Sequence, residues 1–182
     1  MASIVAFSLL PLAAMFLFFH PIQSNEQTQQ NIETICHQVE DYNFCKQSLN
    51  SNLKNPDASI SDLNEITINQ TTVKATDTRA FTQGVLKNAK GYPEEAKVLS
   101  ECEKDYGLVV EFFQEAFKSQ NRGDYSRMLS FESSALNAIS LCEAGFGFGF
   151  PVNPYFYLIE RNKPLKTLIN MAVAIAHTFF NV

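Results

Sequence analysis

The sequence predicts an all-α protein, an up-and-down four-helix bundle with an N-terminal helical hairpin and two disulfides. Beyond residue 24, apolar residues recur at intervals of three and four, the period of a helix that packs one face against its neighbours. No Asn-Gly or Asp-Gly dipeptide separates alternating apolar runs, so the usual signal of a β-hairpin is absent. Four periodic segments have the length of bundle helices.

The first 24 residues differ in composition from the rest of the chain. Seventeen of them are apolar and none is charged. The apolar run is followed by the small residue Ser24 and a polar stretch, the pattern of a secretory signal peptide. We therefore expect residues 1–24 to be removed and residues 25–182 to form the mature domain. An uncleaved membrane anchor is the alternative, and Pro11 and the lack of flanking charges count against it.

The mature chain begins with two short helical segments within residues 31–50, which carry Cys36 and Cys45. In a secreted protein an even number of cysteines favours disulfides over metal ligation, and four cysteines allow three pairings. Chain order favours Cys36–Cys45 and Cys102–Cys142. No two cysteines have the CxxC spacing of a zinc site, so we expect neither a metal nor a cofactor.

The first bundle helix is expected over residues 61–89, with Ser61 as its cap. Its middle, NQTTVKATDT, is polar, so packing rather than propensity must hold it together. The sequon Asn69-Gln70-Thr71 is a candidate glycosylation site. The residues expected to face inward are Leu63, Ile66, Val73, Phe81 and Val85.

The second and third bundle helices are predicted to form an antiparallel pair. The second spans residues 93–120, and Asp124 caps the third after a turn at Gly123. Cys102 and Cys142 lie at similar distances before and after Gly123, so antiparallel packing puts them at the same height. This geometry selects the Cys102–Cys142 bridge. The inward face of the third helix is expected to carry Met128, Phe131, Ala135, Ala138 or Ile139, and Cys142.

The fourth bundle helix is expected over residues 164–180. The segment before it, AGFGFGFPVNP followed by YFY, is predicted to be an irregular linker. Its aromatic residues form either an exposed contact surface or, as we favour, a loop folded back over the end of the bundle. The inward residues expected in the fourth helix are Leu165, Leu168, Ala172, Ile175 and Phe179.

Composition and motifs argue against several functions. A net charge of −5 lacks the basic footprint that nucleic-acid binding needs. The GxGxG at residues 145–149 is not flanked by a βαβ pattern, and GxSxG, HExxH and P-loop motifs are absent. The three histidines are isolated, so we do not expect an enzyme. Carboxylates are frequent on the second and third helices. The default interpretation is that they form solvated helix surface. The functional interpretation is that they form an acidic face that docks onto a basic protein.

Four sequence segments, taken together, resemble the plant invertase and pectin methylesterase inhibitor family. They are CHQVEDYNFC around the first two cysteines, LSECEKDY at Cys102, GDYSRML after the turn, and SSALNAISLCEAGF at Cys142. The resemblance covers residues 31–180 and implies the same bundle and disulfide pairing. It also implies a secreted protein without catalytic activity, which blocks the substrate cleft of a carbohydrate-active enzyme of the cell wall or vacuole.

The turn sequence bears on the target. Many invertase inhibitors of this family carry Pro-Lys-Phe after the Gly-Asp, whereas this chain has Tyr125-Ser126-Arg127, and GDY is commoner among the pectin methylesterase inhibitors. The resemblance therefore favours pectin methylesterase in a one-to-one complex in the apoplast. The alternative function is inhibition of an acid invertase. The third is that of a secreted binding protein that inhibits no enzyme. The expected target-binding residues are Asp105, Glu111, Asp124 and Glu132.

Overall fold

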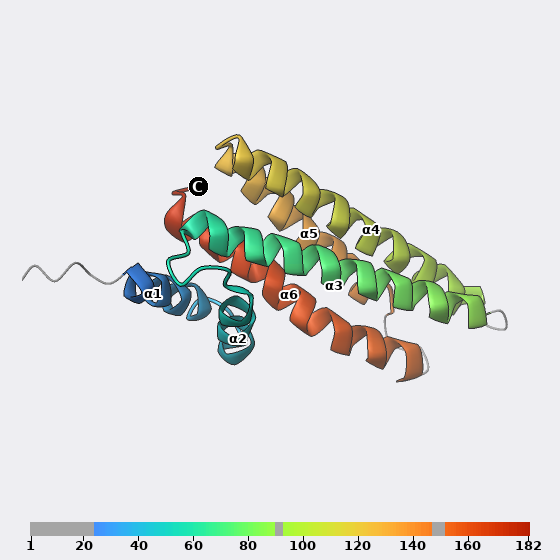
Figure 1. Cartoon of the computed structure of the whole chain (residues 1–182). Helices are drawn as coiled ribbons and strands as arrows, with labels where there is room; N and C mark the ends of the chain where they lie inside the picture. Colours follow the sequence, from blue (N-terminus) through green and yellow to red (C-terminus); the bar gives the residue numbers. More distant parts are fainter. Residues whose placement is uncertain (1–23, 90–92, 147–151) are drawn as a thin grey trace, which may run out of the picture.

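The computed structural model describes residues 24–89, 93–146 and 152–182, and within these ranges it contains six helices and no strands (Figure 1). The predicted signal peptide therefore lies outside the described residues except for Ser24, and so does the linker segment 147–151. The helices are α1 (Ser24–Cys36), α2 (Tyr42–Asn52), α3 (Ile60–Asn88), α4 (Pro93–Asn121), α5 (Tyr125–Gly145) and α6 (Val152–Phe179).

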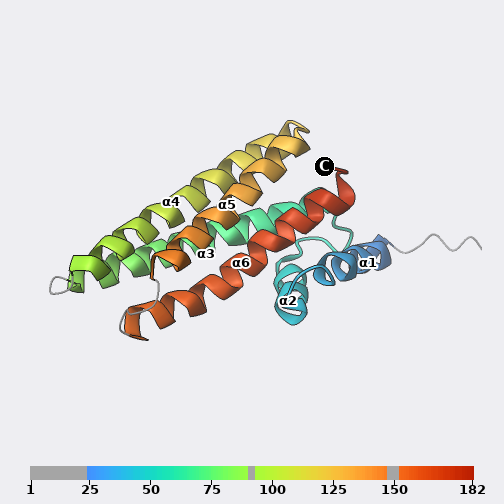
Figure 2. The same cartoon turned by 180° about the vertical axis from the view of Figure 1, so that it is seen from behind.

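The four long helices form the predicted bundle. Helix α3 packs against α4 and α6, and α5 packs against the same two helices, so the bundle is a closed ring of four neighbours. Helices α1 and α2 form a short hairpin that lies outside this ring, against α6 and α3 (Figures 1 and 2). The all-α class, the four-helix bundle and the N-terminal hairpin are thus confirmed.

Two apolar clusters share helix α6. Inside the bundle, Leu99, Phe113 and Ile139 pack against Leu165 and Ile169 of α6. The other cluster joins the hairpin to the bundle, and its members include Ile32, Ile35, Leu49, Leu168, Met171 and Ile175. Burial of each such Ile or Leu side chain stabilises the fold by about 1.5–3 kcal/mol. The hairpin is therefore held on the bundle by a core of its own.

The cap of helix α3 lies two residues earlier than predicted. Its cap is Ser59 rather than Ser61, because Ser59 and Asp62 satisfy each other's backbone N–H groups in a capping box. The Asp62 amide donates to Ser59 Oγ at 3.2 Å, and the Ser59 amide donates to Asp62 Oδ2 at 2.8 Å. The Ser59 hydroxyl also donates to Asp62 Oδ2 at 2.7 Å, and the two bonds that this carboxylate accepts, from the hydroxyl first and then from the Ser59 amide, lower the pKa of Asp62.

The buried face of α3 is largely threonine. Val73, predicted to face inward, is 61% exposed, so that prediction is wrong. The hydroxyls of the buried threonines donate to main-chain carbonyls of their own helix, which satisfies them without a partner from another helix. The buried positions in this part of α3 are Thr67, Ile68, Thr71, Ala75, Thr78 and Thr82.

Helix α6 begins at Val152 and not at Pro164. Pro164 lies inside the helix, where it removes only the hydrogen bond that its own N–H would make to the carbonyl of Glu160. The helix continues on the N-terminal side of the proline because Leu158 and Asn162 are buried against the bundle. The irregular linker is therefore shorter than predicted.

Candidate functional site: the α4–α5 face

The face formed by α4 and α5 is tied at its open end by the Cys102–Cys142 disulfide, whose Cα atoms are 4.6 Å apart. Next to the bridge, the buried Tyr106 hydroxyl donates to Asn162 Oδ1 at 2.7 Å. Asn162 Nδ2 in turn donates to Glu143 Oε1 at 3.2 Å. This chain of contacts joins α4, α5 and α6, so the end of the face is held in place by three helices.

The opposite end of the face is closed by the turn at Gly123. Gly123 has a φ of +71°, in the left-handed region that glycine adopts without strain. Asp124 then caps α5, because its Oδ1 accepts from the Arg127 amide at 3.1 Å. The predicted end of α4 at Gln120 is confirmed to within one residue, and α4 and α5 both begin where the sequence signals placed them.

An aromatic contact crosses the seam between α4 and α5. The rings of Phe112 and Phe131 stack with their centroids 6.2 Å apart, and the Arg127 guanidinium lies 5.5 Å above the Phe131 ring. Phe131, predicted to face the core, is only half-buried and belongs to this outer seam. Sequence reasoning missed the contact between Arg127 and Phe131. Their i, i+4 spacing places them on the same side of a helix and could have predicted it.

Asp105 lies in a hollow of about 280 Å³ near the disulfide, together with Glu101 and Leu141. Burial, and then the neighbouring charge of Glu101, raise the pKa of the Asp105 carboxyl. Leu141 is 66% exposed, an unusual state for a large apolar side chain beside two carboxylates. The hollow therefore combines acidic and apolar groups that are accessible to another molecule.

The other two carboxylates that were predicted to bind a partner lie away from this hollow. Glu111 is exposed on α4, and Asp124 is exposed at the turn. Since α4 extends sixteen residues beyond Asp105, the turn lies about 25 Å from it along the helix axis. Glu111 is six residues from Asp105, which places it about 120° around α4. Asp105, Glu111 and Asp124 therefore do not form a single cluster.

Glu132 does not belong to this surface. Its exposed fraction is 0%, and neither carboxylate oxygen has a hydrogen-bond partner among the described residues. Burial raises its pKa to about 8, an effect that the Asn64 amide partly offsets. The prediction that Glu132 faces a partner is thus corrected, because the inward seam of α5 passes through Met128, Glu132 and Ala135.

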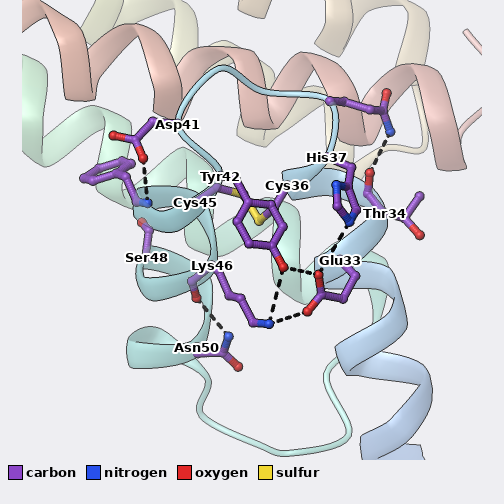
Figure 3. The surroundings of a disulfide bond; sticks show 12 residues. Glu33, Thr34, Cys36, His37, Asp41, Tyr42, Cys45, Lys46, Ser48 and Asn50 are labelled. Carbon is purple, nitrogen blue, oxygen red and sulfur yellow. Dashed lines mark hydrogen bonds and ion pairs between the residues drawn. A yellow bond between two sulfur atoms is a disulfide. The ribbon is translucent and has the colours of Figure 1, made fainter.

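The N-terminal hairpin has its own disulfide and ion pair (Figure 3). Cys36 and Cys45 are bridged with their Cα atoms 5.5 Å apart, as predicted. The Glu33 carboxylate accepts from Lys46 and from the Tyr42 hydroxyl, which joins α1 to α2 beside the bridge (Figure 3). These two partners, Lys46 first, lower the pKa of Glu33. The hairpin is thereby fixed as a unit.

Among residues 24–89, 93–146 and 152–182, no three His, Cys, Asp or Glu side chains come together in a way that would hold a metal ion. In the same ranges, none of the helices is both apolar enough and long enough to cross a membrane.

The fold defines the class of protein: an all-α bundle with a disulfide-clamped hairpin and a disulfide-tied helix pair. Over residues 30–175 the chain matches the model of the family described as plant invertase/pectin methylesterase inhibitor. The chain belongs to this family, whose members are inhibitors of carbohydrate-active enzymes. The resemblance noted in the cysteine frame is thereby confirmed.

Two solved structures share the fold. One is a mutant form of a pectin methylesterase inhibitor from Arabidopsis, with 23% identity, a TM-score of 0.69, and coverage of 81% of this chain and 96% of that one. The other is a pectin methylesterase inhibitor from Arabidopsis thaliana, with 22% identity, a TM-score of 0.61, and coverage of 82% and 95%. None of the curated proteins compared with the chain matches it significantly.

Proposed function

We propose that this protein is a secreted inhibitor without catalytic activity of its own, which occupies the substrate cleft of a plant pectin methylesterase. Membership of the inhibitor family and the fold shared with two pectin methylesterase inhibitors support the role. Residues 1–24 act as the signal peptide, and residues 25–182 form the inhibitor domain of the apoplast or vacuole. Inhibition would regulate the methylesterification of cell-wall pectin.

The observation that carries the proposal is the geometry of the α4–α5 face. A disulfide holds one end of the face and a capped turn holds the other. A rigid surface loses little conformational entropy on binding, so more of the contact energy appears as affinity. The hollow with Asp105 and Leu141 supplies one apolar anchor beside acidic groups, and Glu111 and Asp124 add exposed carboxylates elsewhere on α4 and at the turn.

The charge pattern suits the rim of an enzyme cleft with basic or polar groups. Carboxylates at a rim accelerate encounter and orient the partner, while an apolar side chain that is desolvated on binding contributes more of the affinity. We therefore assign orientation to Asp105, Glu111 and Asp124, and anchoring to Leu141. The GDY sequence at the turn favours pectin methylesterase over an acid invertase as the one-to-one target.

The test is a titration of a plant pectin methylesterase with the purified protein, with methanol release as the readout at mildly acidic pH. We expect saturable inhibition with an equivalence point near one inhibitor per enzyme. The L141D variant should weaken inhibition at least tenfold, about 1.4 kcal/mol, because it places a charge in the anchor. E111K should weaken it a few-fold and mainly slow association.

The matched control is D57K, which makes the same kind of charge reversal on the exposed connection between α2 and α3. It should inhibit like the unchanged protein. No inhibition by the unchanged protein at micromolar excess would overturn the proposal. The same titration with an acid invertase tests the alternative target, and failure with both enzymes would leave a non-inhibitory binding protein on this scaffold.

A further inference from the structure

The sequon lies where the hairpin meets the bundle. Asn69 is exposed on α3, between two hollows that both include its side chain. The smaller, of about 170 Å³, is bounded by the α2–α3 connection. The larger, of about 440 Å³, is a groove between α2, α3 and α6 whose apolar lining includes Phe44, Val73 and Pro164. Asn69 is thus an exposed polar residue that lines a partly apolar groove.

The three residues of the sequon have different environments. Gln70 makes two hydrogen bonds to Ser48 of α2: its Oε1 accepts from the Ser48 hydroxyl, and its Nε2 donates to the Ser48 carbonyl at 3.2 Å. Thr71 is fully buried, and its hydroxyl donates to the carbonyl of Thr67 at 2.7 Å. Asn69 is exposed and Gln70 is half-buried in the folded protein. Asn69 belongs to the one N-x-S/T sequence in the 182 residues.

This environment determines when the site can be modified. Transfer of a glycan to Asn requires the enzyme to reach the Thr hydroxyl of the sequon, and in the folded chain that hydroxyl is buried and already bonded. Modification must therefore precede the folding of α3. Once α3 has formed, Asn69 points to solvent, so an attached glycan is compatible with the native packing.

We propose that Asn69 carries an N-linked glycan, attached before α3 folds, whose first sugars lie in the groove between α2, α3 and α6. The proposal rests on the proposed secretion of the chain. In the transfer, Asn69 Nδ2 forms a bond to C1 of the first sugar of a lipid-diphosphate-linked oligosaccharide. The bond between C1 and the diphosphate oxygen breaks, the amide nitrogen loses one proton, and the lipid diphosphate leaves, so no redox partner is needed.

The groove suits the first sugars of such a glycan. Pyranose rings have apolar faces that pack on apolar side chains, and polar edges that bond to amides and charges. Val73 offers an exposed apolar surface one helical turn from Asn69, and Phe44 and Pro164 continue it. Asn52, Lys74 and Asp77 line the same groove and supply polar partners. The glycan would cover the apolar surface that α3 presents between the hairpin and the bundle.

The occupancy test is expression of the full chain in a eukaryotic secretory host, followed by intact-mass measurement and N-terminal sequencing. We expect a glycan mass on the unchanged protein and on T71S, which keeps the sequon. N69Q and T71V should lack it, and T71V keeps a side chain of similar size in the buried site. A secreted, leader-cleaved but unmodified protein would overturn the proposal.

The position of the glycan is tested by thermal unfolding. Amidase removal of the glycan converts Asn69 to aspartate, so N69D from the same host is the matched control with the same sequence as the product. We expect the glycosylated protein to have a higher Tm than the amidase-treated protein and than N69D. This difference in Tm should be smaller in the V73S background, which removes part of the groove surface. Equal Tm values would show that the glycan does not lie in the groove. Inhibition by N69Q should be unchanged, which keeps this result distinct from the test of the proposed function.

Discussion

At the scale of single residues, Glu132 illustrates how a helix face can carry an unexpected side chain. The carboxyl lies between α3, α4 and α5, near the Asn64 amide, which bonds instead to Gln120 Oε1 at 2.6 Å. Since neither carboxylate oxygen has a hydrogen-bond partner in the part of the chain that the structure describes, the neutral form of Glu132 is strongly favoured. The protonation of this one group therefore contributes to the pH dependence of stability.

The sign of the Glu132 effect follows from the two pKa values. Below about pH 4.5 the carboxyl is protonated in both the folded and the unfolded chain, and its contribution to stability is complete. Between about 4.5 and about 8 only the unfolded chain ionises, so the free energy of unfolding falls by up to about 1.4 kcal/mol per pH unit. We expect E132Q to flatten this decline in urea unfolding between pH 5 and 7.5. The exposed control E111Q should leave the slope unchanged, and an unchanged slope in E132Q would contradict the assignment.

Residue spacing alone does not separate Glu132 from Phe131. Each lies three or four residues from both Met128 and Ala135, so each continues the inward face of α5. Sequence reasoning chose Phe131 because it is apolar and left Glu132 on the surface because it is charged. In the structure Glu132 is fully buried and Phe131 is half-buried, so residue type was a misleading guide at these two positions.

At the scale of elements, the helices with strong terminal signals were predicted best. Pro93, Gly123 and Asp124 define the ends of α4 and the start of α5, and the structure confirms all three. Helix α6 was predicted to begin at a proline that the helix in fact contains, because buried contacts outweigh one missing hydrogen bond. The threonine face of α3 escaped prediction because apolarity was taken as the sign of burial.

The start of α3 offers a direct test of capping. We expect S59A to lower the free energy of unfolding by about 1 kcal/mol, because it leaves the Asp62 amide without its hydroxyl acceptor. S61A should have a much smaller effect, since Ser59 and Asp62 make the capping bonds and the Gln120 side chain bonds to the main-chain carbonyl of Ser61, which the substitution keeps. Urea unfolding at constant pH measures both. A larger loss for S61A than for S59A would refute the capping box.

At the scale of the whole molecule, two disulfides close loops of different length. The Cys36–Cys45 bridge closes a short loop, and the Cys102–Cys142 bridge spans a sequence separation of 40. Chain entropy assigns about 2.7 kcal/mol to the first and about 3.9 kcal/mol to the second. Both pairings were predicted from the sequence, because chain order and helix geometry point to the same partners.

The paired substitution C102A/C142A is therefore expected to cost more stability than C36A/C45A, by roughly 1 kcal/mol in urea unfolding. Loss of inhibition should also differ. C102A/C142A should inhibit more weakly, because it frees one end of the α4–α5 face. C36A/C45A, which changes only the hairpin bridge, should inhibit nearly as well as the unchanged protein. Equal inhibition by both variants would indicate that the ordered end of the face is not used.

The shared helix α6 has a further consequence for how the chain can be divided. One side of α6 completes the bundle core, and another side, with Leu168, Met171 and Ile175, is covered only when the hairpin is present. A fragment beginning at α3 would keep its four long helices but uncover that apolar stripe. Such a fragment should self-associate as its concentration rises, so the hairpin serves as a solubilising cover as well as an N-terminal extension.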